Sequence, residues 1–302
     1  MIARILRGLT EGQRHMVAAA FFFSIMALLV KWAGQLGFPS HMLVLARAVV
    51  TLILSVAWLA RSRVPVRGKR PGLLLLRGMT GTVALMCFYY SLTELPLADS
   101  TIIQYTNPLL TALLAGAVLR ERMEPWQWIA ASFSLAGILL VAQPGWLTGA
   151  DEPRLPWFPV MIAFIGSVMS AVSYIIVREL RKTDEPMLIV AWFPFVAVPA
   201  VLPLVWMDPH WPEGWQWLLM AGIGVATQAG QIAMTRALHA ETASRATGMS
   251  YVQIAFAFGW GLVIFGESIR WSSVVGALLI VAGTVGMGWW AGRSPARAGA
   301  PD

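Results

Sequence analysis

Ten long apolar runs constrain this chain more than any other feature of its sequence. A helix needs roughly 20 apolar residues to cross a hydrocarbon layer of about 30 Å. The runs are too long and too continuous for the short alternating strands of a membrane barrel. We therefore expect an all-α membrane protein with ten transmembrane helices. The predicted spans are residues 16–36, 41–60, 72–93, 97–119, 126–143, 157–178, 187–206, 215–238, 243–265 and 271–291.

Composition excludes the other large classes of protein. Hydrophobic residues make up 58% of the 302 residues and charged residues 12%, whereas soluble domains carry about 25% charged residues. A typical cytosolic enzyme and a disordered chain are therefore excluded. The single cysteine, Cys87, excludes a domain built on disulfides. The net charge of +7 does not indicate nucleic-acid binding, because the basic residues lie in short connections between apolar runs.

The distribution of lysine and arginine predicts the orientation. Cytoplasmic connections of membrane proteins carry an excess of these residues. With a cytoplasmic N-terminus, 18 of the 22 lysines and arginines fall on the inner side, Arg77 among them. The other four are Lys31, Arg47, Arg154 and Arg270. We expect a multi-pass protein of the inner (plasma) membrane with both termini in the cytoplasm.

An internal repeat divides the chain into two halves. A shift of 146 residues aligns Tyr105 with Tyr251 and Glu121 with Glu267, and helices three to five fall on helices eight to ten. The units are 1–145 and 146–291, followed by a short disordered tail, 292–302. Each holds five helices, so the second enters the membrane from the opposite side. Such inverted repeats are typical of secondary transporters, although a duplication kept only for packing is the alternative.

Several short motifs resemble a known family. They are Phe88-Tyr89-Tyr90-Ser91-Leu92, Pro96-Leu97-Ala98-Asp99-Ser100-Thr101, Asn107-Pro108 and Leu119-Arg120-Glu121-Arg122. The chain is similar to the drug/metabolite transporter superfamily and, within it, to the EamA-type ten-helix transporters. The first three motifs are particularly similar to the branch with animal organic-anion-type carriers of the G subgroup. The resemblance implies a central cavity among helices one to four and six to nine, with helices five and ten at the periphery.

Polar side chains inside the spans are the candidate site residues, since polar groups avoid hydrocarbon. Amides offer four hydrogen-bonding sites, and basic groups can hold a carboxylate or phosphate. The alternatives are interhelical hydrogen bonds for the amides and snorkelling for Lys31 and Arg47. The candidate substrate-binding residues are Lys31, Arg47, Tyr89, Tyr90, Gln104, Asn107, Gln228, Gln231 and Gln253.

The repeat-equivalent residues Tyr105 and Tyr251 are candidate gating residues. Their places in the two spans predict that one narrows the pathway near the outside and the other near the inside. Ordinary aromatic packing is the alternative. Pro108 removes a backbone hydrogen bond and should kink helix four.

The acidic residues and the small residues of helix ten lead to expectations about helix capping, proton coupling and helix packing. Glu121 and Glu267 should cap helices five and ten, which they immediately precede. No acidic residue lies near mid-membrane, which favours a facilitator or an exchanger over proton coupling through a central carboxylate. The small residues of helix ten, Gly276 among them, suit close packing within the chain or in a homodimer, and the sequence does not choose between these.

Together these features predict a secondary transporter that moves a small organic anion or an amino-acid-like metabolite by alternating access. An exporter of cationic or amphipathic drugs is the alternative within the same class. A membrane enzyme and a non-transporting receptor are alternatives of other classes. The sequence has no HExxH motif and no cluster of metal ligands, so we expect no catalysis, metal or cofactor. The expected partners are a small-molecule substrate and the lipid bilayer.

Overall fold

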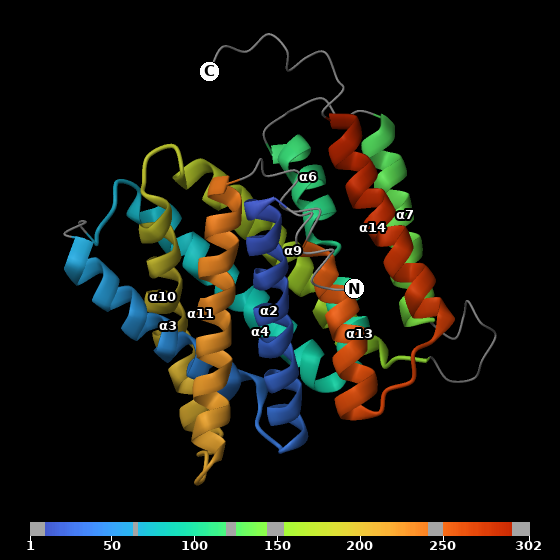
Figure 1. Cartoon of the computed structure of the whole chain (residues 1–302). Helices are drawn as coiled ribbons and strands as arrows, with labels where there is room; N and C mark the ends of the chain where they lie inside the picture. The colour runs from blue at the N-terminus through green and yellow to red at the C-terminus, as the bar shows by residue number, and fades with distance from the viewer. Residues whose placement is uncertain (1–9, 63–65, 119–124, 144–153, 241–249, 292–302) are drawn as a thin grey trace.

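The computed structural model describes residues 10–62, 66–118, 125–143, 154–240 and 250–291, and every regular element in these ranges is an α-helix (Figure 1). Six of the described helices are long and apolar enough to cross a membrane. Since α5 and α6 are two parts of one span, the described residues include a helix for each of the ten predicted spans, although residues 243–249 of the ninth span lie outside them. The helices are α2 (Glu11–Gln35), α3 (Ser40–Ser62), α4 (Pro71–Glu94), α5 (Leu97–Gln104), α6 (Asn107–Val118), α7 (Pro125–Ala142), α9 (Trp157–Leu180), α10 (Pro186–Met207), α11 (Gln216–Ala240), α13 (Val252–Phe265) and α14 (Trp271–Ala291).

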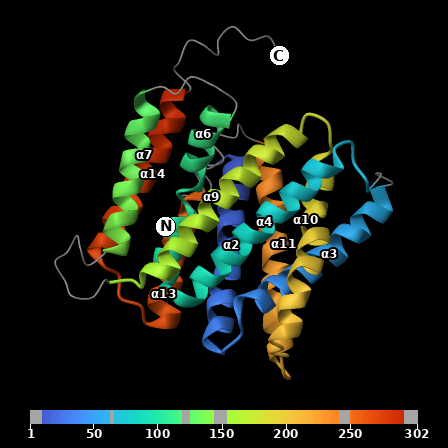
Figure 2. The same ribbon diagram turned by 180° about the vertical axis from the view of Figure 1, so that it is seen from behind.

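The packing of the helices follows the repeat. α2 packs along α11, and their repeat equivalents, α9 and α4, also pack on each other. The contact of α6 with α9 is matched in the same way by that of α13 with α2. α7 packs on its own equivalent, α14, and α3 packs on α10. The α7–α14 pair forms one edge of the bundle (Figures 1 and 2), which is the peripheral place expected for helices five and ten.

The predicted kink in helix four is confirmed as a break between α5 and α6. Tyr105 is the C-terminal cap of α5, and α6 begins at Asn107. Pro108 therefore falls in the first turn of α6, where its missing N–H costs nothing. Tyr251 holds the equivalent place in the second half, as the N-terminal cap of α13. In the described part of the second half, Tyr251 thus forms a turn between the helical residues 250 and 252, as Tyr105 does after α5 in the first half.

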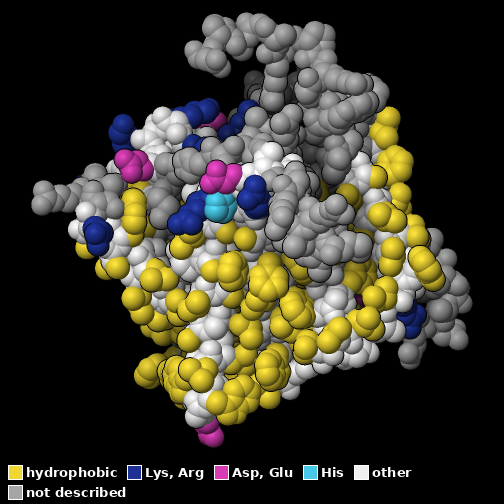
Figure 3. Space-filling model, in the orientation of Figure 1, with side chains coloured by type: hydrophobic (Ala, Val, Ile, Leu, Met, Phe, Trp, Pro, Cys, Tyr) yellow, Lys and Arg dark blue, Asp and Glu magenta, His cyan; other side chains and the backbone are white. Residues whose placement is uncertain are grey.

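The two ends of the bundle differ in surface chemistry. We call the end with the α3–α4 and α9–α10 connections the inner end, and the end with the α4–α5 and α13–α14 connections the outer end. Figure 3 shows charged side chains gathered above a broad apolar surface. Arg61, Arg70 and Arg178 are exposed at the inner end. Exposed tryptophans such as Trp206 and Trp271 lie at the outer end, where their rings suit a membrane–water interface.

Gly276→Ala in α14 should destabilise the protein, because α7 and α14 meet at this point backbone to backbone. A Cβ atom at position 276 would lie 2.6 Å from the carbonyl oxygen of Gly137 and 2.7 Å from a methyl group of Val141. We expect a loss of about 1–3 kcal/mol, measured as a lower Tm in detergent. Gly259→Ala in α13 is the matched control, since a Cβ there has no neighbour within 4 Å. Equal Tm values for both variants would contradict this packing.

Candidate functional site

A central cluster of polar side chains surrounds the break between α5 and α6. The hydroxyl of Tyr105 donates toward the backbone oxygen of Ser250 at 2.7 Å and toward Oε1 of Gln253 at 3.0 Å. The ring centroids of Tyr105 and Tyr251 are 5.1 Å apart. The prediction that these tyrosines lie at opposite ends of a pathway is therefore wrong. Each lies at the interruption of its own span, and the two interruptions meet in the bundle.

Gln104 extends the central cluster toward α9. Its amide nitrogen donates to the hydroxyl of Ser170 at 3.2 Å. Its oxygen, Oε1, is buried and has no hydrogen-bond partner among the described residues. Gln253 is also buried, with Tyr105 as its donor. Buried polar atoms without a partner are costly, so the free oxygen of Gln104 marks a place where a polar ligand would gain a hydrogen bond.

Two arginines lie against one aromatic ring, that of Phe193 in α10. The guanidinium carbon of Arg47 is 5.7 Å from the ring centroid of Phe193 and 5.9 Å from that of Tyr89. The guanidinium carbon of Arg77 is 5.8 Å from the same Phe193 ring. Tyr89 itself is fully buried, and its hydroxyl lies 3.1 Å from the sulfur of Met26.

Arg77, which the charge count placed on the inner side, lies within a helix and not in a connection. Arg77 lies inside α4, about two turns from the start, and its Nε and Nη1 atoms are buried. The sequence already holds the signal, because position 77 falls inside the run predicted to span the membrane. A basic residue at such a position is a candidate interior residue.

Lys31 and Glu267 form an ion pair at the outer end. Lys31 Nζ is 2.8 Å from Oε1 of Glu267 and donates to the backbone oxygen of Leu95 at 2.6 Å. The same carboxylate accepts the backbone N–H of Leu97, with N–O distances of 3.2 and 3.0 Å. Glu267 therefore caps α5, in the other half of the chain, and not helix ten as predicted. Its repeat equivalent, Glu121, lies outside the described residues.

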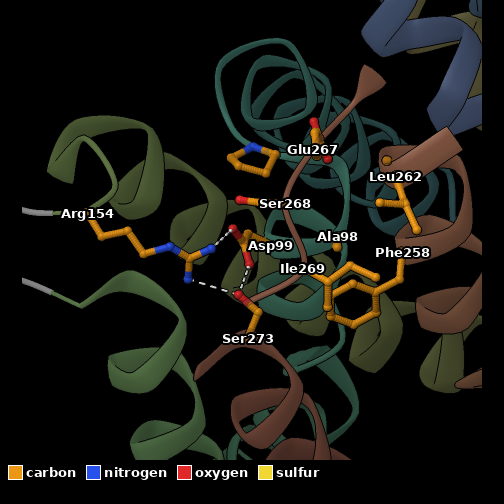
Figure 4. Close-up of a pocket in the computed structure, with 11 residues that line it drawn as sticks. Ala98, Asp99, Arg154, Phe258, Leu262, Glu267, Ser268, Ile269 and Ser273 are labelled. Carbon is orange, nitrogen blue, oxygen red and sulfur yellow. Dashed lines mark hydrogen bonds and ion pairs between the residues drawn. The ribbon is translucent and has the colours of Figure 1, made fainter. Parts of the chain in front are cut away.

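A second ion pair lies beside the first in a shallow pocket (Figure 4). Arg154 Nη2 is 2.8 Å from Oδ2 of Asp99, and the hydroxyl of Ser273 donates to Oδ1 of Asp99 at 2.6 Å. Asp99 is only 1% exposed. We call Lys31, Asp99, Arg154, Glu267 and Ser273 the outer closure. It joins α2 and α5 of the first half to the α13–α14 region and Arg154 of the second half. Its pairing was not predicted, because these residues are far apart in the chain.

The other predicted residues lie outside these contacts. Tyr90 packs on Phe158, with ring centroids 6.1 Å apart, and so turns away from its buried neighbour Tyr89. Asn107 accepts a hydrogen bond from Thr111 at 3.1 Å within α6. Gln228 and Gln231 are half-buried in α11. The described residues hold no group of three or more potential metal ligands among His, Cys, Asp and Glu.

Comparisons with known proteins agree on one family. The profile of the EamA-like transporter family matches residues 13–143 and again residues 157–289. The pseudopaline exporter CntI of Pseudomonas aeruginosa is 27% identical over 94% of this chain and 98% of its own length. Human solute carrier family 35 member G1 is 29% identical over 91% of this chain and 78% of its own length.

One further relative and one solved structure are also similar to this chain. The riboflavin transporter of Vibrio cholerae is 25% identical, and the alignment covers 93% of each chain. One crystal structure matches with a TM-score of 0.61 at 18% identity, over 91% of this chain and 98% of that chain. At this identity the structural match supports the fold alone.

Proposed function

Because this chain belongs to the EamA-like transporter family, we propose that it moves a small organic anion or an amino-acid-like metabolite across the inner membrane by alternating access. The family and the relatives are transporters of small molecules and not enzymes. The chain is accordingly a multi-pass membrane transporter. The proposed substrate class, mechanism and orientation are each supported by a different group of charged side chains.

The observation that carries the substrate class is the charge of Arg47. A charged side chain inside a membrane span is expensive unless it is paired. Lys31 and Arg154 meet this requirement through the carboxylates of Glu267 and Asp99. Arg47 has aromatic rings beside it, and its Nε has no hydrogen-bond partner among the described residues. An anionic substrate would supply the missing negative charge, whereas a cationic drug would add to the repulsion.

Alternating access is supported by the position of the outer closure. Its two ion pairs join the two halves at the outer end, and the central cluster lies deeper, at the interrupted spans. This form of the protein is closed on the outer side, so access to the centre would come from the inner side. Separation of the ion pairs would give the opposite form. Among the described residues the inner end carries most of the exposed arginines and lysines, with Arg270 exposed at the outer end. This excess favours placement of the inner end in the cytoplasm together with both termini.

The placement of the acidic groups favours facilitated diffusion or exchange. In the described spans, Asp99 and Glu267 are bound to basic partners at the outer end. The central cluster consists of amides, hydroxyls and phenols. A proton-coupled carrier would need a titrating carboxylate that faces the substrate. Among the described residues the cluster has no such group, so the energy would come from the substrate gradients.

Counterflow in liposomes tests this function. Purified protein is reconstituted into vesicles loaded with one unlabelled compound, and uptake of the same labelled compound is followed. We expect accumulation for organic carboxylates or amino acids and none for a quaternary amine. Protein-free vesicles are the control. Accumulation of the quaternary amine alone would support a drug exporter instead, and binding without any counterflow would support a receptor.

A further inference from the structure

The pair Arg47 and Arg77 forms a second feature that the proposed function does not yet explain. The two residues come from neighbouring helices, α3 and α4, and both guanidinium groups lie against Phe193 of α10. α10 packs on both helices, so Phe193 lies where the three meet. Each guanidinium is therefore held beside the same aromatic ring, inside the bundle.

These two positive charges lack a counterion in the described part of the chain. Their guanidinium carbons lie 5.7 and 5.8 Å from the same Phe193 ring centroid, so the two charges repel each other. Arg47 Nε, Arg77 Nε and Arg77 Nη1 are buried, and none has a hydrogen-bond partner among the described residues. Two half-buried like charges whose buried nitrogen atoms lack partners are unfavourable in a membrane span. The chain satisfies two other buried cations, Lys31 and Arg154, with carboxylates, so the missing anions at this pair point to a bound ligand.

Gly81 leaves room for the Arg77 side chain, because it has no side chain of its own. It lies one turn after Arg77 on α4, and a Cβ atom at position 81 would collide with Nη1 of Arg77 and would lie 3.2 Å from the Phe193 ring. Only a glycine lets the guanidinium lie along α4 beside Phe193 without displacement. The position of the charge therefore depends on a second residue of the same helix.

The geometry favours a ligand with two carboxylates. A guanidinium presents a planar fork of donors that binds one carboxylate with two hydrogen bonds. A monocarboxylate would neutralise one arginine and leave the other unpaired, whereas a dicarboxylate would neutralise both. The half-buried ring of Phe193 offers an apolar wall for a hydrocarbon spacer.

We propose that Arg47 and Arg77 bind the two carboxylates of an organic dianion, with Phe193 between the two guanidinium groups. This inference rests on the proposed function and narrows its substrate class. The test uses purified full-length protein in detergent and follows Tm by tryptophan fluorescence. The probes are the linear dicarboxylates from malonate to adipate, the monocarboxylate butyrate, the neutral diamide succinamide, chloride, and phosphatidylglycerol added to the micelles.

We expect at least one dicarboxylate to raise Tm at concentrations at which butyrate, succinamide and chloride do not. Arg47→Gln and Arg77→Gln should each weaken its binding by about tenfold or more, and Arg77→Lys should recover part of the loss. Gly81→Ala should weaken binding by displacing Arg77. Arg61→Gln, an exposed arginine of α3, is the matched control and should bind as the wild type does.

Stability without ligand separates a binding role from a structural one. Removal of one of two repelling charges should leave the Tm of unliganded Arg77→Gln equal to or above that of the wild type. A lower Tm would mean that Arg77 holds the fold and would overturn the inference. Equal stabilisation by butyrate or chloride, or an Arg77-dependent effect of phosphatidylglycerol in place of the dicarboxylates, would also overturn it.

The proposed function can survive the failure of this inference. Suppose that carboxylates exchange in the counterflow assay but Arg77→Gln binds them as the wild type does. The proposal of an anion transporter is then supported, and the dicarboxylate site at Arg47 and Arg77 is wrong. If the wild type exchanges neither carboxylates nor amino acids, the proposed substrate class itself is wrong.

Discussion

Asp99→Asn should open the outer end of the protein. The substitution keeps the shape of the side chain but removes the charge that pairs with Arg154 at 2.8 Å. Removal of one partner from a buried ion pair costs about 3–5 kcal/mol, because the other charge is left uncompensated. The pair joins the two halves, so the loss falls on the closed form, and the balance should shift toward a form that is open on the outer side.

Cysteine labelling measures this opening. In a Cys87→Ser background, a reporter cysteine replaces Ala98, which lies in the wall of the outer pocket and is only 6% exposed. Asp99→Asn should raise its labelling rate by about tenfold or more, given the size of the lost interaction. Ser273→Ala removes the hydrogen bonds of this hydroxyl with Asp99 and Arg154 but no charge, and should act in the same direction by a smaller factor.

Glu94→Gln is the matched control, since Glu94 is an exposed acid at the outer end of α4. It should leave the labelling rate unchanged. Glu267→Gln should reproduce the effect of Asp99→Asn, because it breaks the neighbouring pair with Lys31 and weakens the cap of α5. Unchanged labelling in both Asp99→Asn and Glu267→Gln would show that the ion pairs do not hold the outer end closed.

Tyr105→Phe should slow exchange by about tenfold. The substitution keeps the ring beside Tyr251 but removes the hydroxyl that lies between Ser250 and Gln253. The buried amide oxygen of Gln253 then loses its donor, at a cost of about 1–3 kcal/mol. Because this contact joins the two interrupted spans, its loss should change the relative stability of the two forms and hence the rate of counterflow.

Two further variants test whether this effect comes from the central contact. Tyr90→Phe removes a phenol hydroxyl from the neighbouring helix α4 at a half-buried position on the Phe158 side, and should exchange at the wild-type rate. Tyr105→Ala also removes the ring contact and should have a larger effect than Tyr105→Phe. Wild-type exchange in Tyr105→Ala would exclude a gating role for this residue.

The break at the α5–α6 junction shows what local sequence can predict. Pro108 cannot donate a backbone hydrogen bond, and this property belongs to the residue whatever surrounds it. The interruption at Tyr251 in the second half has isoleucine at the position equivalent to Pro108. Only the repeat suggested that Tyr251 would hold a comparable place.

For the site residues too, the local sequence predicted some properties and not others. Arg47, Tyr89, Gln104, Tyr105 and Gln253 were identified because polar and charged groups inside an apolar run need a partner. Their contacts were not predicted, and one geometric expectation, the separation of Tyr105 from Tyr251, was wrong. The residue chemistry is local, but the choice of partner depends on the rotation and tilt of helices that are far apart in sequence.

The ten spans, the repeat and the polar residues of the interior could be predicted from the amino-acid sequence, because apolar length and hydrogen-bonding capacity are properties of short segments. The pairing of Lys31 with Glu267, the pairing of Asp99 with Arg154 and the shared ring of Arg47 and Arg77 became evident only from the folded chain. Each of these brings together groups from different helices. The energy of a charge in a membrane depends on which groups surround it, and that choice is made when the helices pack.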